Sequence, residues 1–174
     1  MTAEGIRVRV GGTADAAWVL PLYDQAVAWL AASGRAGQWG TEPWSAQPDF
    51  VARLNRVAED AGLRVAEADD HLAGAVRLTR APWYVPAAAE PELYLEGFVV
   101  DRRYGGRDIG RTLLEAARAE AAGSGARQLR LDCWADGDQA LVRYYEHAGF
   151  TATGRVTLPH VLGGWEGTIL TRRL

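Results

Sequence analysis

The spacing of hydrophobic residues in the first third of the chain changes from every second position to a helical repeat. Residues 6–10 read Ile-Arg-Val-Arg-Val, an alternation that predicts a first β-strand with its aliphatic side chains on one face. Thr13 is then a suitable N-cap for a helix that ends at Gly34 and Gly37. Pro21 cannot donate a hydrogen bond inside that helix, so we expect it to kink there or to restart with Pro21 in its first turn. The apolar positions at helical spacing are Val19, Leu22, Ala26, Trp29 and Leu30.

Four tryptophans lie in and after this helix. Trp18 and Trp29 fall within the helical segment, where large aromatic residues usually pack inward, and we expect them to be core residues. Trp39 and Trp44 fall in or beside a segment that glycine, proline and threonine mark as a loop, residues 38–44. These two tryptophans are therefore the better candidates for the wall of a pocket.

The rest of the chain alternates between helix and strand patterns. Expected helices cover residues 49–61, 108–123 and 139–147. Expected strands cover residues 63–68, 72–80, 92–101, 128–134, 150–158 and 165–172, the first two joined by a tight turn at Asp69-Asp70-His71. The length suits one hydrophobic core, so this order predicts a single domain over residues 1–174, of the α/β or α+β class, with a mixed sheet and helices on its faces.

The passage from the strand 92–101 to the next helix carries most of the chemical information. Residues 99–112 read Val-Val-Asp-Arg-Arg-Tyr-Gly-Gly-Arg-Asp-Ile-Gly-Arg-Thr, a glycine-rich turn between a strand and a helix. Glycines let a ligand approach the backbone closely, and the first turn of a helix offers free N–H groups and partial positive charge. Four arginines in this stretch add bidentate donors for phosphate oxygens. The sequence therefore predicts a site for an anionic, nucleotide-like cofactor.

One interpretation of this turn is a P-loop. Residues 105–112 fit the pattern G-x-x-x-x-G-K-S/T with Arg111 in place of the lysine. A P-loop normally follows the opening strand of a parallel sheet, whereas this turn lies past the middle of the chain and precedes one strand, one helix and a terminal hairpin. The P-loop interpretation, which predicts magnesium-dependent nucleotide binding, is the less favoured one.

The turn also resembles the acetyl-CoA motif of the GNAT acyltransferases, a strand followed by R/Q-x-x-G-x-G/A at the start of a helix. Residues 141–150, Leu-Val-Arg-Tyr-Tyr-Glu-His-Ala-Gly-Phe, resemble the second signature of that family, Tyr-Glu-x-x-Gly-Phe on a helix that leads into a strand. The two segments stand in the family's order. The resemblance implies the GNAT fold, a mixed and mostly antiparallel central sheet with helices on both faces and two splayed central strands, here residues 92–101 and 128–134.

The resemblance further implies that acetyl-CoA is the cofactor, with its pantetheine arm between the splayed strands and its pyrophosphate at the turn. The implied cofactor-binding residues are Val99, Val100, Gly105, Gly106, Arg107, Asp108, Ile109, Gly110, Arg111, Thr112 and Asp138. Gly105 stands where the motif has Arg or Gln, Asp108 stands where it has its first glycine, and Asp138 replaces a usual asparagine, although it can cap its helix equally well.

The substitution at Asp108 opens an alternative function. Its carboxylate would repel a phosphate, or it would cap the following helix and occupy the N–H groups that a phosphate needs. The alternative is a non-catalytic acyl-CoA-binding or ligand-sensing domain with an impaired pyrophosphate site. The favoured function is an N-acetyltransferase that transfers the acetyl group of acetyl-CoA to a primary amine in a ternary complex, since the neighbouring arginines offset one carboxylate.

Acyl transfer to an amine needs a neutral amine, a polarised carbonyl and a proton for the departing thiolate. By resemblance, Tyr145 is the general acid and the backbone N–H of Val100 polarises the carbonyl. Glu96 is the first candidate for the general base, directly or through a water, and the alternatives are that it only binds a cationic substrate or that no base is needed. Glu92 lies on the same strand face, and with Trp39 and Trp44 it is a candidate for binding the acceptor.

Composition limits the remaining choices. The net charge of −3 is spread along the chain, which argues against a nucleic-acid surface. The sequence has neither an apolar run long enough for a membrane span nor a leader pattern, so we expect a cytoplasmic protein. Cys133, the single cysteine, is expected to be an inert strand residue. We expect no metal site, an amine of a small molecule or peptide as acceptor, and leave a homodimer open.

Overall fold

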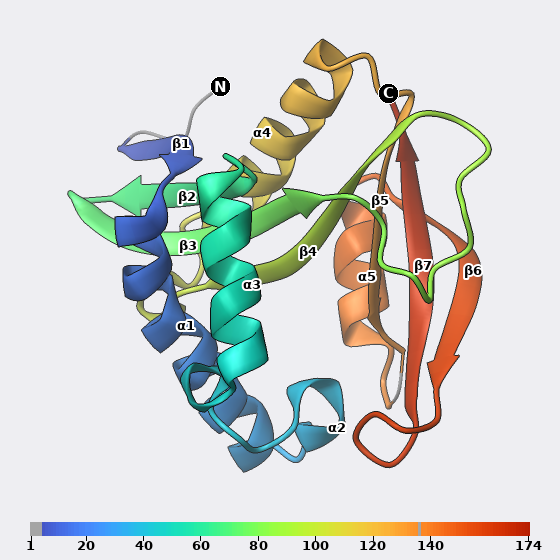
Figure 1. The fold of residues 1–174 in the computed structure, drawn as a ribbon, viewed down its shortest axis with the longest axis horizontal. Helices are drawn as coiled ribbons and strands as arrows, with labels where there is room; N and C mark the ends of the chain where they lie inside the picture. Colours follow the sequence, from blue (N-terminus) through green and yellow to red (C-terminus); the bar gives the residue numbers. More distant parts are fainter. Residues whose placement is uncertain (1–4, 136) are drawn as a thin grey trace.

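The computed structural model describes residues 5–135 and 137–174 of the chain. Within these ranges seven strands form one sheet that helices cover on both faces (Figure 1). The strands are β1 (Ile6–Gly11), β2 (Leu63–Ala68), β3 (His71–Thr79), β4 (Glu92–Val100), β5 (Gln128–Trp134), β6 (Thr151–Leu158) and β7 (Trp165–Arg173). The helices are α1 (Thr13–Ala32), α2 (Ala36–Trp39), α3 (Pro48–Glu59), α4 (Ile109–Gly123) and α5 (Ala140–His147), with short 3-10 segments η1 (Trp44–Ala46) and η2 (Arg102–Tyr104).

The strands follow one another across the sheet in the order β1-β2-β3-β4-β5-β7-β6. Every neighbouring pair is antiparallel except β4 and β5, which run parallel. These two are in register only where residues 92–94 face residues 128–130, although β4 continues to Val100 and β5 to Trp134. Figure 1 shows the two strands diverging beyond that point. The expected mixed, mostly antiparallel sheet with two splayed central strands is therefore confirmed.

The two faces of the sheet carry different helices. Leu113 of α4 and Val142 of α5 are buried in one hydrophobic cluster together with Leu95 and Leu131 of the central strands. On the other face α1 and α3 pack on the N-terminal strands, and their buried residues include Val19, Tyr23, Phe50 and Leu54. The expectation of helices on both faces is confirmed. Each helical layer forms its own hydrophobic cluster with residues of the sheet that lies between them.

Helix α1 differs in two ways from what its sequence suggests. It is one continuous helix with Pro21 inside it, and its N-cap is Gly12, whose N–H donates to the Asp15 carboxylate over 2.9 Å, so Thr13 is already the first helical residue. Both Pro21 and Ala17, four residues earlier, are exposed. The carbonyl that Pro21 leaves without a partner therefore faces solvent, which is where a helix tolerates this loss.

The two helical tryptophans do not form part of the core. Trp18 is 73 % exposed, so the expectation that it packs inward is wrong, since the buried stripe of α1 runs through Val19 and Tyr23 and leaves Trp18 beside it. Trp29 is half-buried, and the guanidinium of Arg102 lies 3.7 Å from its ring centroid. The other element ends agree with expectation to within about two residues, and α2 is a short helix inside a segment expected mostly as loop.

Candidate active site

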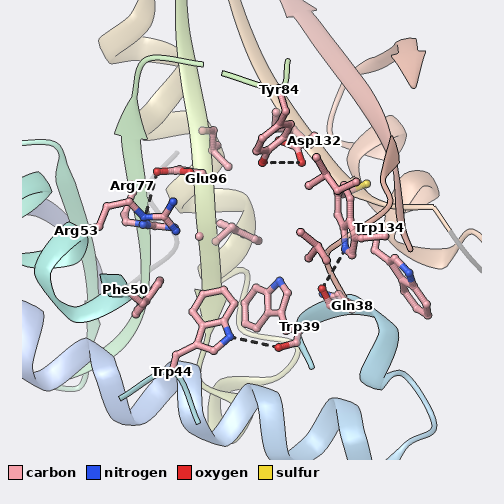
Figure 2. Close-up of a pocket in the computed structure, with 18 of the residues that line it drawn as sticks. Gln38, Trp39, Trp44, Phe50, Arg53, Arg77, Tyr84, Glu96, Asp132 and Trp134 are labelled. Atoms are coloured by element: carbon pink, nitrogen blue, oxygen red, sulfur yellow. Dashed lines mark hydrogen bonds and ion pairs between the residues drawn. The ribbon is translucent and has the colours of Figure 1, made fainter. Parts of the chain in front are cut away.

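A cavity of about 670 Å³ opens where β4 and β5 separate. Its walls come from the cavity side of these two strands, from α2 and α3, and from the loop between β6 and β7 (Figure 2). Residues distant in the sequence thus meet around one space. Those that line it include Trp39, Trp44, Phe50, Arg53, Arg77, Tyr84, Glu96, Asp132, Cys133, Trp134, Tyr145 and Trp165.

Tyr145 of α5 lines this cavity. Its side chain is only 5 % exposed and contacts Phe98 and Phe150, with ring centroids 6.1 and 5.9 Å away. Burial raises the pKa of the phenol well above its usual range, so the hydroxyl is protonated at neutral pH. Among the described residues the hydroxyl has no hydrogen-bond partner. The group is therefore a proton donor that faces the cavity.

Glu96 of β4 faces the same cavity. One carboxylate oxygen, Oε1, lies 3.5 Å from Nη1 of Arg77 on the neighbouring strand β3, and a fifth of the Glu96 side chain remains exposed. Arg77 and Glu96 are cross-strand partners in the β3–β4 register. The expected candidate for a base is thus brought into the cavity, beside a buried cation.

Asp132 of β5 is a second carboxylate in the cavity, and sequence reasoning missed it. The Tyr94 hydroxyl donates to its Oδ1, and the Tyr84 hydroxyl donates to its Oδ2 over 3.5 Å. Burial raises the pKa of the Asp132 carboxyl, which makes it a stronger base than an exposed aspartate. A signal was present in the sequence: Arg130, Asp132 and Trp134 alternate with apolar residues, which puts two charges on one face of a central strand.

Cys133 points to the opposite side of β5 from Asp132. Its side chain is buried, and burial raises the pKa of the thiol to about 12. The thiol therefore stays protonated near neutral pH, in keeping with its expected inert role.

Of the three residues expected to bind the acceptor, two line the cavity and one does not. Trp39 and Trp44 line the cavity and pack on each other with ring centroids 4.4 Å apart, and the Trp44 indole N–H donates to the Trp39 carbonyl over 3.3 Å. Glu92 does not line the cavity. It lies at the paired end of β4, where its carboxylate accepts from Arg130 over 2.9 Å. The expectation that Glu92 belongs with the acceptor-binding residues therefore has no support in the geometry, because the strands separate only after Tyr94.

The glycine-rich turn joins the carboxyl end of β4 to α4. Val99 is buried under α1 and faces Ala75, and Val100 faces Gly74 of β3. The backbone reaches positive φ at Gly106 (+80°) and at Asp108 (+61°) just before α4 begins at Ile109. The left-handed conformation explains why the related motif has glycine where this chain has Asp108, since aspartate is one of the few other residues that tolerate it.

The carboxylate of Asp108 does not cap α4, so that expectation is wrong. No side chain accepts from the first turn of this helix, and the Asp108 carboxylate accepts instead from Arg111 over 2.7 Å. This hydrogen bond lowers the pKa of Asp108, which is therefore ionised at neutral pH. Because this carboxylate pairs with Arg111, the N–H groups of residues 109–111 stay without a side-chain acceptor among the described residues.

The other arginines of the turn have partners of their own. Arg103 pairs with the buried carboxylate of Asp101 over 2.6 Å, and Arg107 pairs with Asp69. The N-cap of α5 is Gln139 rather than Asp138, whose carboxylate nevertheless accepts from the Ala140 N–H at the start of the helix over 3.0 Å. The remaining residues expected to bind the cofactor, Gly105, Gly110 and Thr112, lie in the turn and in the first turn of α4, where the Thr112 hydroxyl donates to the Asp108 carbonyl.

This turn fits a phosphate group. An added Cβ at Gly106 would meet nothing within 4 Å, and the neighbouring helix N-terminus has free amides and no side-chain cap. Gly110 also permits close packing, since an added Cβ would collide with the Tyr144 hydroxyl and lie 3.1 Å from the Phe98 ring. Together with the divergent strands and the buried tyrosine, the turn defines the class of acyl-CoA-dependent transferases.

The comparisons with known proteins agree with this class. A sequence model of the acetyltransferase (GNAT) family matches residues 23–150. The chain is 27% identical over 154 residues to the uncharacterized N-acetyltransferase YesJ of Bacillus subtilis (strain 168), an alignment that covers 81% of this chain and 85% of that protein. The chain therefore belongs to the GNAT family, and it is an acyltransferase that uses acetyl-CoA.

Solved structures give the same fold. A GNAT-family acetyltransferase from Listeria monocytogenes 4b F2365 superposes with a TM-score of 0.72 at 22% identity, over 100% of this chain and 99% of that one. The Salmonella typhimurium protein yncA, solved with its cofactor acetyl-CoA, gives a TM-score of 0.67 at 20% identity, over 98% and 95% of the two chains. The family assignment and the mostly antiparallel sheet exclude the P-loop interpretation of the turn.

The described residues contain no group of three or more His, Cys, Asp or Glu side chains placed to hold a metal ion. Within the same ranges, none of the helices has the length and apolar character needed to span a bilayer.

Proposed function

We propose that this protein is an N-acetyltransferase that acts on a primary amine of a small molecule or peptide, with both substrates bound at once. The observation that carries the proposal is the meeting of three groups in one cavity at the open end of the β4–β5 pair, namely the Tyr145 phenol and the carboxylates of Glu96 and Asp132. One is a protonated acid and two are acceptors for the proton of an amine, and direct transfer needs both kinds of group.

The cofactor site is proposed from the same geometry. Bound acetyl-CoA supplies an activated acetyl thioester. The free amides of residues 109–111 and the turn at 105–112 would bind its pyrophosphate. Residues 95–100 of β4 have lost their β5 partner and would offer backbone hydrogen bonds to the pantetheine amides, and the Val100 N–H would polarise the thioester carbonyl.

The chemical roles follow from the protonation states. Asp132 or Glu96 accepts a proton from the amine, whose nitrogen then forms the bond to the acetyl carbon while the carbon–sulfur bond breaks. The Tyr145 hydroxyl donates its proton to the departing sulfur. Burial raises the pKa of Asp132, which makes its carboxylate a stronger base toward an amine than an exposed aspartate would be.

The test is a kinetic comparison of Tyr145→Phe with the wild type. Loss of a general acid costs about a hundredfold or more in turnover, whereas the affinity for acetyl-CoA should change little, because the phenol touches only the reacting end. Turnover is measured by thiol release with an amine panel, and affinity by calorimetric titration. Trp18→Phe is the control, since the Trp18 side chain is largely exposed on α1 and lies outside the cavity.

Two results would contradict the proposal. Unchanged turnover in Tyr145→Phe would remove Tyr145 from the mechanism. Binding of CoA by the wild type without thiol release for any amine in a broad panel would favour the non-catalytic acyl-CoA-binding function instead.

A further inference from the structure

The cavity contains a buried guanidinium whose donors lack acceptors. Arg77 of β3 is 2 % exposed, and its Nε and Nη1 atoms have no hydrogen-bond partner in the described parts of the chain. The Glu96 carboxylate lies 3.5 Å from Nη1 as an ion pair without hydrogen-bond geometry. A buried charge of this kind is unfavourable unless its donors are satisfied, so the site calls for an additional acceptor.

The position of this guanidinium is fixed by its surroundings. It lies against the backbone of Gly97, where an added Cβ would come within 2.5 Å of Nε and 2.7 Å of the Tyr23 hydroxyl. Gly97 has φ +60° at an irregularity in the β3–β4 register, and the Phe50 ring lies 5.1 Å from Cζ of Arg77. Because Gly97 of β4 has no side chain, the Arg77 side chain of β3 has room to lie against it. Arg77 also lines the cavity, so a molecule bound there is the nearest source of an acceptor for these two donors, which are shielded from solvent.

Charged groups of both signs line the cavity. Arg77 and Arg53 flank Phe50, with Arg53 exposed and its Cζ 5.8 Å from the ring. Glu96 lies beside Arg77, and Figure 2 shows Asp132 of the other divergent strand across the cavity from Arg77. Trp39 and Trp44 form an aromatic wall below both. A ligand that fills this space therefore meets cations, carboxylates and an apolar surface.

We propose that the acceptor is a zwitterionic amine, an α-amino acid or a close analogue. This inference rests on the proposed function of the same cavity. The substrate carboxylate accepts bidentate hydrogen bonds from Arg77, assisted by Arg53 at the mouth, and the amine lies beside Glu96 and Asp132. The Arg77–Glu96 pair places opposite charges 3.5 Å apart, which complements a molecule whose own carboxylate and amine are separated by a single carbon. The Trp39–Trp44 wall suits an apolar or aromatic side chain on that carbon.

Other amine classes leave part of the site unsatisfied. A polyamine has no anionic group for Arg77 and would add positive charge beside a buried cation. A peptide N-terminus presents an amide where the site has a guanidinium, and a neutral carbonyl is a weaker acceptor than a carboxylate. These classes are therefore distinguished by the charge next to the amine.

The first experiment compares matched substrates with the wild-type protein. L-tryptophan, L-phenylalanine and L-methionine are each assayed against their carboxamides and against the corresponding decarboxylated amines, with kcat/KM obtained from thiol release at saturating acetyl-CoA. We expect the free acid to exceed its amide by about tenfold to a hundredfold, the value of a hydrogen bond to a charged group. The amine of a carboxamide is less basic, so a preference for the acid cannot arise from a larger fraction of neutral amine.

The second experiment removes the guanidinium. In Arg77→Met the ratio of acid to amide should fall close to one, and in Arg53→Gln it should fall partly. Arg118→Gln, an exposed arginine of α4 outside the cavity, should keep the wild-type ratio. Each ratio is measured within a single preparation, and thermal melting and acetyl-CoA binding check the fold. If Arg77→Met fails to fold, the matched substrates and Arg53→Gln still decide the question.

A binding measurement separates this inference from the proposed function. Tryptophan fluorescence, or saturation-transfer NMR for L-tryptophan itself, reports binding of the same amino acids and amides without any turnover. Binding of the acids that is lost in Arg77→Met supports the inference even if no amine is acetylated. Acetylation of amides or decarboxylated amines as efficient as that of the acids overturns the inference and leaves the acetyltransferase intact. An unchanged ratio in Arg77→Met overturns it as well, as does binding of inorganic phosphate in place of the amino acid.

Discussion

At the scale of single residues, Asp108 illustrates how a motif position can keep its backbone and change its charge. The left-handed φ of +61° is what the glycine of the related motif provides, and aspartate reaches it at modest cost. Its ionised carboxylate stays close to the first turn of α4 but pairs with Arg111 and leaves the helix amides free. The proposed phosphate site is therefore altered in charge, while its backbone keeps the left-handed conformation that glycine provides in the motif.

A calorimetric titration of acetyl-CoA into the wild type, Asp108→Gly and Asp108→Asn tests this interpretation. We expect the wild type to bind and both variants to bind more tightly, by up to about tenfold, because each removes one exposed negative charge beside the pyrophosphate. Asparagine tolerates the left-handed conformation and so isolates the effect of charge from that of the backbone. Weaker binding by both variants would mean instead that the Asp108–Arg111 pair holds the turn in its binding shape.

Sequence reasoning identified some site residues and missed others for a physical reason. Tyr145, Trp39 and Trp44 follow from a motif or from local composition, and all three line the cavity. Arg77 and Asp132 do not, because their importance depends on cross-strand neighbours and on the register irregularity beside Gly97. Local periodicity states which face of a strand a residue is on, but it does not state which charges it meets there.

At the scale of elements, one part of β4 pairs with β5 and the other part separates from it. Its first part pairs with β5, and its second part bends away at Gly97, where a positive φ and the absence of a side chain admit the Arg77 guanidinium. The residue range of β4 was predicted from the sequence to within one residue, whereas the irregularity was not. Glycine inside a strand signals such a feature only in general terms.

Gly97→Ala should destabilise the protein by about 2 kcal/mol or more, since a left-handed alanine costs about 1–2 kcal/mol and overpacking adds to it. The free energy of unfolding is measured by urea denaturation. Gly123→Ala at the end of α4 is a control of opposite sign, because an added Cβ there meets nothing within 4 Å and alanine favours the helix by about 0.5–1 kcal/mol. Equal stability of the two variants would disprove the close packing proposed at Gly97.

At the scale of the whole molecule, the segment around α2 contacts the C-terminal part of the chain at or near the cavity. The Trp165 indole N–H at the start of β7 donates to the Gln38 carbonyl of α2 over 3.2 Å, and Arg35 pairs with Asp138 over 3.4 Å. The order of elements and the fold class were predictable from the chain, because they depend on local patterns and on the family resemblance. These two contacts were not predictable, since they join segments far apart in the sequence whose meeting depends on the complete fold.

Trp165→Phe should keep an aromatic ring at this position and remove the indole N–H that donates to the Gln38 carbonyl. We expect the free energy of unfolding to fall by about 1 kcal/mol, which lowers the melting temperature by about 2–4 °C. The KM for the amine should rise, and the affinity for acetyl-CoA should stay unchanged. Trp18→Phe is the control, since Trp18 is largely exposed and its replacement should change stability by less than about 0.5 kcal/mol. An unaltered KM in Trp165→Phe would mean that this contact does not shape the acceptor site.

The short β4–β5 ladder also divides the sheet into two blocks of consecutive chain. Residues 6–100 supply β1 to β4, residues 128–173 supply β5 to β7, and each block is held together by its own antiparallel ladders. Three register pairs of β4 and β5 join the blocks in the described part of the chain, next to a hydrogen bond from the Arg127 N–H to the Pro91 carbonyl, and the hydrophobic cluster under α4 and α5 spans both blocks. The cavity is lined by residues of both blocks, so a molecule bound there contacts both halves of the chain across the unpaired stretch of strand.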